Sequence, residues 1–207
     1  MSELDHLVLA TPHLTETVRT VADLLGIEPV PGGQHVGRGT RNYLLGLGNG
    51  GYLELIGPDP DQPDPAQPRP FGLDTLAEPR LITWAVQTTD IDAAIATART
   101  AGYDPGDASN LSRATPAGDL LSWRLTYPRV NLGEASLVPF LIDWGTTRHP
   151  SLDLPQSKLL SLTAIHPDPH PTRTHLEALS ATLEVRPGLR PTLIATLDGP
   201  QGPVTLL

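Results

Sequence analysis

Residues 4–26, LDHLVLATPHLTETVRTVADLLG, contain the pattern that decides the fold of this chain. The segment from Leu4 to Ala10 is apolar and rich in branched side chains, which favours a β-strand, and a proline-containing turn follows it. From Leu14 to Leu25 the apolar residues recur on one helical face, and Gly26 suits a left-handed helix cap. The stretch therefore predicts a strand, a turn and an amphipathic helix in immediate succession.

The same succession occurs three times along the 207 residues. A second strand is expected at 81–87 with a helix at 91–101, and a third strand at 159–165 with a helix behind it. The third helix is expected to turn three leucines inward: Leu176, Leu179 and Leu183. The residues at the three helix starts are 77 and 78 positions apart: His13, Asp90 and Asp168. This spacing indicates an internal repeat, and the two aspartates are expected to cap their helices.

Further short strands follow each helix. Asn49-Gly50 lies between apolar runs at 42–47 and 52–56, which is a strong hairpin signal. Later strands are expected in the second and third copies, at 112–115, 120–127, 137–144, 190–197 and 204–207. Each copy is thus a strand–helix–strand–strand–strand (βαβββ) module, and the fold class is α+β.

The modules are separated by proline-rich connectors. The expected boundaries are 1–57 for the first module, 58–70 for the linker, 80–145 for the second module and 150–207 for a third, shorter module. The linker carries six prolines between residues 58 and 70, so it can form neither a helix nor an inner strand. The linker therefore separates the first two modules, which together span residues 1–145.

Composition excludes several classes of protein. A formal net charge of −9 argues against nucleic acid or an anionic membrane surface as a partner, since both need a basic face. The chain has no cysteine, which excludes catalysis by a thiol and metal sites with cysteine ligands. No apolar run is long enough to span a membrane and the first residues lack a signal-peptide pattern, so a cytoplasmic location is expected.

Tandem βαβββ modules resemble the vicinal oxygen chelate superfamily, which includes glyoxalase I, extradiol dioxygenases and the bleomycin and fosfomycin resistance proteins. The motifs are most similar to its glyoxalase-like branch. The stretches that carry this resemblance are LDHLVLA at 4–10, GGQHVGRGTRN at 32–42, YLELI at 52–56, PFLIDWG at 139–145 and HPDP at 166–169. The resemblance implies that the first two modules pair into a cupped mixed sheet around a cleft.

The resemblance also implies a divalent metal, held by one residue from the first strand and one from the last strand of each module. The first module supplies His6 and Glu54, a nitrogen and a carboxylate that suit Zn, Ni, Mn or Fe. The second module departs from the pattern, because Thr83 or Trp84 stands opposite His6 and Phe140 stands opposite Glu54. The alternative for His6 and Glu54 is a structural one, in which both face solvent on strands that have one exposed face.

Other polar and aromatic residues are candidates for the same cleft. His35 lies in a glycine-rich loop, where it could replace a missing metal ligand or contact the substrate. Asp143 is the nearest carboxylate of the second module and, with Glu54, a candidate to move protons, although it could equally be a turn residue. Guanidinium groups bind carboxylates and indole rings line pockets. The candidate substrate-binding residues are His35, Arg38, Asn42, Trp84, Trp123 and Arg124.

Two functional classes follow. One is a metal-dependent lyase or isomerase of the glyoxalase-like type, acting on a small carbonyl- or carboxylate-bearing molecule. The alternative is a metal-free protein that binds or sequesters a small molecule, and the missing second-module ligands favour it. The His6–Glu54 pair favours the enzyme. A homodimer is a further expectation, because an odd number of modules leaves sheet edges for a second subunit to cover.

Overall fold

A computed structural model describes residues 2–115, 118–127 and 134–207. The first module contains β1 (Glu3–Ala10), α1 (Leu14–Leu25), β2 (Val30–His35), β3 (Thr40–Gly46) and β4 (Tyr52–Pro58). After the 3-10 turn η1 (Pro70–Thr75), the second contains β5 (Arg80–Gln87), α2 (Ile91–Thr100), β6 (Ala108–Ala114), β7 (Leu120–Thr126) and β8 (Phe140–Asp143). After the 3-10 turn η2 (Pro150–Asp153), the third contains β9 (Leu159–His166), α3 (Pro169–Ala178), β10 (Glu184–Pro187), β11 (Thr192–Gly199) and β12 (Gly202–Leu206).

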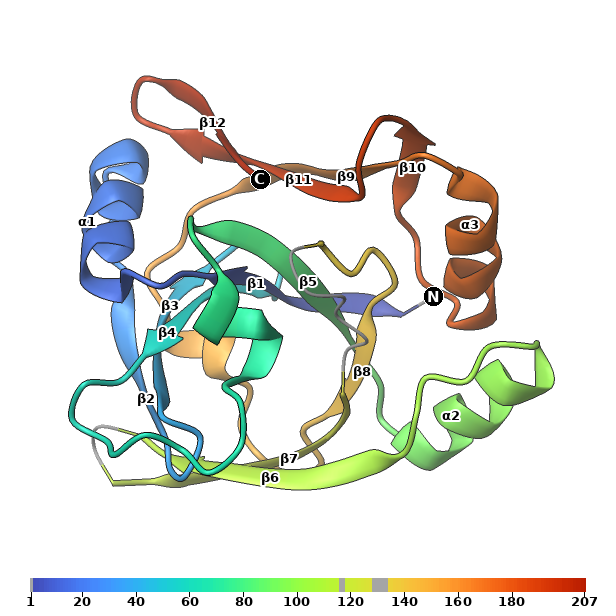
Figure 1. The fold of residues 1–207 in the computed structure, drawn as a ribbon, viewed down its shortest axis with the longest axis horizontal. Coiled ribbons are helices and arrows are strands. Elements are labelled where there is room, and N and C mark those ends of the chain that lie inside the picture. Colours follow the sequence, from blue (N-terminus) through green and yellow to red (C-terminus); the bar gives the residue numbers. More distant parts are fainter. Residues whose placement is uncertain (1, 116–117, 128–133) are drawn as a thin grey trace.

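The first two modules form one eight-stranded sheet in the order β2-β3-β4-β1-β5-β8-β7-β6. In each module the first and last strands are parallel neighbours, and an antiparallel β1–β5 pair joins the modules. The sheet curls so strongly that its edge strands β2 and β6 approach each other, and Figure 1 looks into this nearly closed curve. The predicted α+β fold with a cupped mixed sheet of paired βαβββ modules is confirmed.

The third module has the same element order but a different strand pairing. Its sheet runs β10-β9-β11-β12, so β9 lies between β10 and β11 instead of beside the last strand. The prediction that Leu183 belongs to the third helix is wrong, because α3 ends at Ala178 and Ser180 takes a left-handed φ of 52°. Leu183 is still buried, in the core shared with the large sheet.

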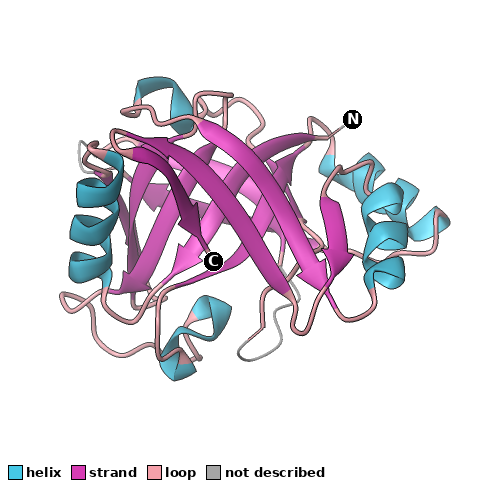
Figure 2. Cartoon of the chain, turned by 90° about the horizontal axis from the view of Figure 1, so that it is seen from above, coloured by secondary structure: helices cyan, strands magenta, loops and turns pink. Residues whose placement is uncertain are grey.

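The second sheet covers the convex face of the first. Leu7 on β1 and Trp84 on β5 belong to one continuous core with Leu193 and Leu197 on β11. Figures 1 and 2 show β9 and β11 lying along one side of the curved sheet, with α1 at one flank and α2 and α3 at the other. The concave face is therefore left for a cavity.

Local signals at the helix ends explain where α1, α2 and α3 start and stop. Asp90 accepts a hydrogen bond from the amide of Ala93 at 3.0 Å, and Asp168 accepts one from the amide of His170 at 3.2 Å, so both predicted caps are confirmed. Gly26 ends α1 with a φ of 66°, a conformation that glycine adopts without strain.

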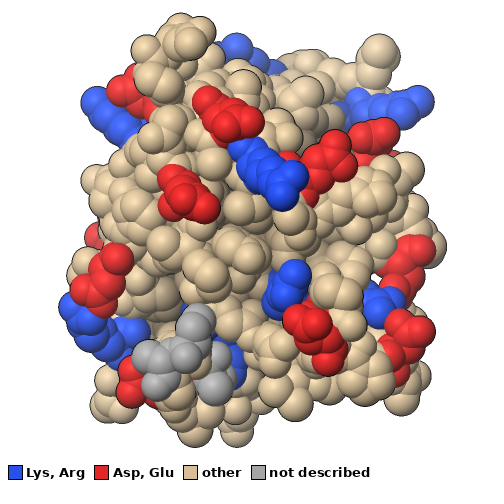
Figure 3. Space-filling model, turned by 90° about the vertical axis from the view of Figure 1, so that its left-hand side faces the viewer, with Lys and Arg blue, Asp and Glu red and all other residues tan. Residues whose placement is uncertain are grey.

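Surface charge does not gather into a basic face on the side that carries α1. Figure 3 shows this side, where acidic and basic side chains are interspersed. Among the described residues, no helix is long and apolar enough to cross a membrane.

Candidate functional site

A cavity of about 460 Å³ opens on the concave face of the eight-stranded sheet. Residues of β1, β3 and β4 line one part of it and residues of β6, β7 and β8 another, so both modules contribute. The turn η1 adds Phe71, whose φ of 61° is unusual for a residue with a side chain. Such a backbone strain is tolerated where the surrounding structure holds it, and here it sets an aromatic ring at the cavity.

The strand register brings His6 and Glu54 together. On β1 and β4, His6 pairs with Tyr52 and Val8 pairs with Glu54, which makes His6 and Glu54 diagonal neighbours on one face. His6 Nε2 lies 3.9 Å from Glu54 Oε2, and the imidazole stacks on the Tyr52 ring at a centroid distance of 4.8 Å. Both side chains line the cavity, so they face a cleft instead of bulk solvent.

Two further predicted residues surround the Glu54 carboxylate. Asn42 Nδ2 donates a hydrogen bond to Glu54 Oε1 at 2.6 Å, and His35 Nε2 lies 3.9 Å from the same oxygen. His35 Nδ1 is 3.0 Å from the Thr40 hydroxyl. Burial lowers the pKa of His35. The negative charge of Glu54 opposes this shift, and the positive charge of Arg113 adds to it. The predicted grouping of His35, Asn42 and Glu54 is thus present in the structure.

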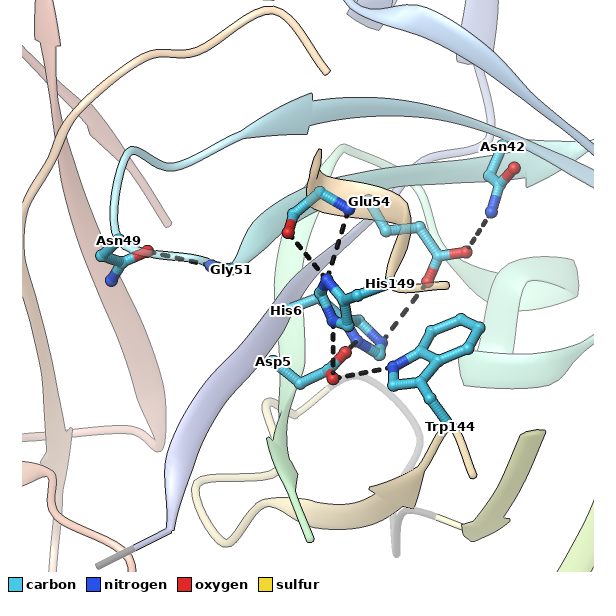
Figure 4. A network of polar contacts seen from close by, with 9 residues as sticks. Asp5, His6, Asn42, Asn49, Gly51, Glu54, Trp144 and His149 are labelled. Atoms are coloured by element: carbon cyan, nitrogen blue, oxygen red, sulfur yellow. Dashed lines mark hydrogen bonds and ion pairs between the residues drawn. The ribbon is translucent and has the colours of Figure 1, made fainter. Parts of the chain in front are cut away.

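Asp5 is a site residue that the sequence reasoning missed. The β1–β5 register shifts between Leu4 and His6, which makes Asp5 the extra residue of a β-bulge. Its Oδ1 lies 2.6 Å from His6 Nδ1, while its Oδ2 accepts a hydrogen bond from Trp144 Nε1 at 2.9 Å and lies 3.0 Å from His149 Nε2. Figure 4 shows this network, in which Asp5 contacts both histidines and Trp144.

The network fixes the protonation of this part of the site. Burial would raise the pKa of Asp5, but hydrogen bonds from His149 and His6 outweigh it and lower the pKa to about 2. An ionised Asp5 can only accept at His6 Nδ1, so it orients the imidazole with Nε2 on the side of Glu54. Asp5 therefore holds His6 with Nε2 at the cavity wall.

Arg113, on β6, is a second site residue that the sequence did not predict. Its side chain is buried, with 6% of its surface exposed, and it lines the cavity. It donates one hydrogen bond, to the carbonyl of Gly32 on β2, and so bridges the two edges of the curled sheet. Within the described parts of the chain it forms no ion pair. Burial lowers the pKa of Arg113, although the nearby Tyr52 and Glu54 side chains act to raise it. A buried guanidinium with most of its donors unused is a candidate anion anchor.

Arg38 and Trp123, two of the candidate substrate-binding residues, lie at the cavity. The guanidinium of Arg38 donates a hydrogen bond to the hydroxyl of Tyr127 at 2.6 Å and lies over its ring. Trp123, on β7, packs against Trp144 with ring centroids 5.3 Å apart. Both side chains line the same cavity as Glu54.

Trp84 and Arg124 lie elsewhere, and their expected role in substrate binding is corrected. Trp84 is buried on the convex side of the sheet and donates from Nε1 to the carbonyl of Leu137 at 2.9 Å. Arg124 forms a surface ion pair with Asp92 at 2.7 Å. The cause is strand alternation, since neighbouring residues of a strand point to opposite faces.

Asp143 is also outside the cavity. Its Oδ1 accepts a hydrogen bond from the amide of Gly145 at 2.8 Å, and its Oδ2 accepts one from the amide of Ile91 at 3.3 Å. It therefore ends β8 and holds the start of α2, as expected of a turn residue. Asp143 lies three positions after Phe140, which puts the two side chains on opposite faces of the strand.

The second module does not complete a four-ligand metal site. Val8 pairs with Glu54 and Ala85 pairs with Phe140, and the 77-residue repeat relates these pairs, so Phe140 occupies the position of Glu54. The same repeat places Thr83 at the position of His6, where its buried hydroxyl has no hydrogen-bond partner. Among the described residues, no group of three or more histidines and carboxylates could hold a metal ion. The donor set therefore does not fit the metal centre implied by the resemblance.

A curled sheet of paired βαβββ modules around a small-molecule cavity defines the class of protein. The chain belongs to the Glyoxalase-like domain family, whose sequence profile matches residues 4–180. Among curated proteins, no sequence matches the chain significantly.

Several solved structures are similar to this chain at low sequence identity, and the first of those below shares its fold. A hypothetical protein from Staphylococcus aureus is 15% identical with a TM-score of 0.66, and the match covers 99% of this chain and 84% of that one. Methylmalonyl-CoA epimerase from Mycobacterium tuberculosis is 20% identical with a TM-score of 0.43, over 68% of this chain and 86% of that one. The Streptomyces coelicolor epimerase in complex with 2-nitronate-propionyl-CoA is 20% identical with a TM-score of 0.44, over 72% and 99%.

Proposed function

We propose that this protein binds a small molecule with a carboxylate next to a carbonyl group and moves a proton at the carbon beside that carbonyl. The observation that carries the proposal is that one cavity contains the His6–Glu54 pair and the buried cation Arg113. The cation recognises the carboxylate, and the pair supplies general acid–base groups. This is isomerase-type chemistry.

Glu54 is the group that takes the proton. Asn42 holds one of its oxygens, which fixes the carboxylate while the other oxygen lies toward His6. Removal of a proton from carbon leaves an enolate, and the electron pair moves onto the carbonyl oxygen. The positive charge of Arg113 at the same cavity favours that developing negative charge. The proton returns to carbon from Glu54 or from His6, which can accept and give a proton at Nε2.

No step is assigned to a metal, because Thr83 and Phe140 replace the ligands that the second module would supply. The same substitutions favour a second candidate function, namely binding of the same class of molecule without turnover. The two functions share a ligand but differ in whether a carbon–hydrogen bond is broken.

Deuterium exchange separates them. The protein is incubated with 2-oxobutanoate in D₂O, and the loss of the signal of the protons at carbon 3 is followed by proton NMR, with exchange in buffer alone subtracted. We expect exchange with the wild type and a loss of about 100-fold in Glu54→Gln, because general base catalysis contributes about 10²–10⁴. The control is Glu28→Gln, an exposed glutamate.

Saturation-transfer NMR on the same samples reports binding. Binding without exchange in the wild type would establish the sequestering function in place of the enzyme. If the protein shows no binding and no exchange, either with 2-oxobutanoate or with longer 2-oxo acids, both candidate functions are contradicted.

A further inference from the structure

We infer that the ligand of this cavity is an aryl carboxylate, with a planar aromatic ring held by Trp123 and Phe71 and a carboxylate held by Arg113. The inference rests on the proposed function and narrows its substrate class. It joins two features of the cavity that the acid–base pair does not explain: an excess of aromatic side chains, and a buried cation that forms no ion pair within the described residues.

Aromatic residues are rare in this chain but concentrated at the cavity. The sequence has three tryptophans, four tyrosines and two phenylalanines. Six of these nine line the cavity: Tyr52, Phe71, Trp123, Tyr127, Phe140 and Trp144. Since the lining residues are about a tenth of the chain, an even distribution would place roughly one aromatic residue there. Aromatic rings pack best on other flat, apolar rings.

Most of these six aromatic rings already make contacts within the protein. Tyr52 stacks on His6, and Phe140 meets the same imidazole edge-on at 5.3 Å, so both position His6. Trp144 is fixed by its hydrogen bond to Asp5. Tyr127 accepts a hydrogen bond from Arg38. Two rings are left for a ligand: Trp123 from β7, which also packs against Trp144, and Phe71 from η1.

Trp123 and Phe71 come from different parts of the chain but share one apolar cluster on the concave face, and both are only partly buried. Phe71 reaches this cluster through a left-handed backbone, which is strained for a residue with a side chain. A simple linker turn does not need a phenylalanine in that conformation. The left-handed backbone of Phe71 is explained if its ring contacts the ligand at the cavity wall.

The carboxylate part follows from Arg113. Arg113 has 6% of its surface exposed and lines the cavity, yet among the described residues its guanidinium donates only to Gly32, with one of its five N–H groups. A buried charge is costly unless it is paired, and a carboxylate pairs with guanidinium through two parallel hydrogen bonds. An uncharged aromatic ligand would leave Arg113 unpaired. An aliphatic acid would lack the flat ring that packs best against Trp123 and Phe71.

The cavity size sets the size of the ligand. About 460 Å³ lies toward the lower end of the roughly 300–1,000 Å³ typical of small-molecule sites. That volume accommodates one ring or two fused rings with a short acidic side chain. Arg38 at the same cavity adds a second cation, which favours an acid over a neutral compound.

The test is calorimetric titration of the full chain with phenylacetate and with cyclohexylacetate, two acids of similar size that differ in the aromatic ring. Phenylacetate is expected to bind about fivefold more tightly, which corresponds to the roughly 1 kcal/mol that an aromatic pair contributes beyond buried area. In Trp123→Leu this preference is expected to vanish, while cyclohexylacetate keeps its affinity within about twofold. The control variant is Tyr103→Leu, an aromatic position outside the cavity.

Equal affinity for the two acids in the wild type would overturn the inference, and so would a preference that survives in both Trp123→Leu and Phe71→Leu. Binding of neither acid would also overturn it. If 2-oxobutanoate still exchanges its protons in any of these cases, the proposed function stands and only the aromatic substrate class is lost. Circular dichroism of each variant shows that the fold is kept.

Discussion

Asp5 Oδ1 lies 2.6 Å from His6 Nδ1, although consecutive residues of a regular strand point to opposite faces. The β-bulge at Asp5 makes this contact possible, because two residues of β1 stand opposite Ala85 of β5. A carboxylate at Nδ1 selects the tautomer of His6 whose Nε2 accepts a proton at the cavity. Asp5 is thus a positioning residue and does not line the cavity itself.

Replacing Asp5 by asparagine is therefore expected to slow exchange without removing the ligand site. In Asp5→Asn we expect the rate of deuterium exchange to fall about 10- to 100-fold, because His6 loses the charge that selects its tautomer. The affinity for the acid is expected to stay within about threefold, since Arg113 is unchanged. Nitrogen NMR of the His6 ring is the specific readout. A tautomer shift is expected in Asp5→Asn but not in Asp23→Asn, an exposed control position. An unchanged tautomer with unchanged exchange would show that the contact is only structural.

Acid stability is expected to depend on the same carboxyl. The pKa of Asp5 is lowered from 3.8 to about 2 in the folded protein, so the unfolded chain takes up the proton first as the pH falls. The contribution to the free energy of unfolding, about 2 kcal/mol, is present above about pH 4 and is lost as the pH falls through 2. In urea denaturation, the stability difference between the wild type and Asp5→Asn should shrink from about pH 5 toward pH 2.5. A difference that is independent of pH would contradict this assignment.

Metal content is a further prediction. Protein purified without a His tag and without chelator is expected to contain less than about a tenth of an equivalent of Zn, Ni, Mn or Fe, because His6 and Glu54 lack partners in the second module. Adding these ions should leave the thermal midpoint unchanged, since a ligand that binds only the folded state would raise it. Plasma mass spectrometry of the wild type and of the His6→Ala, Glu54→Ala double variant checks this. Near-stoichiometric metal that disappears in the double variant would establish a metal centre after all.

The sequence predicts elements well where a signal is local. The apolar spacing of residues 14–25 and the glycine that follows predict α1 with the bounds that the structure has. The Asn49-Gly50 turn likewise predicts the β3–β4 hairpin. Grouping His6 with Glu54 needed the resemblance, because their contact depends on the β1–β4 register and not on any feature near either residue.

What could not be predicted depends on contacts that are distant in sequence. Nothing in the sequence signals that Asp5 is bulged toward His6, because the irregularity arises from pairing with β5. Arg113 becomes a cavity residue only because the sheet curls until β6 meets β2, where it donates to Gly32. The third module shows the same limit, since its element order is that of the other two while its strand pairing is not.

Arg113 provides the most direct test of the account. The methionine variant keeps a long side chain but removes the charge, and Arg190→Met, at an exposed position, is the control. Circular dichroism of both variants checks that the fold is kept.

The decisive measurement is the dissociation constant of phenylacetate for the wild type and for Arg113→Met, by titration calorimetry. We predict a loss of about 10- to 100-fold in Arg113→Met and no loss in Arg190→Met, since a hydrogen bond to a charged group contributes about 1.5–3 kcal/mol. Equal affinity in the wild type and Arg113→Met, with the variant folded, would contradict the claim that this cavity recognises a carboxylate.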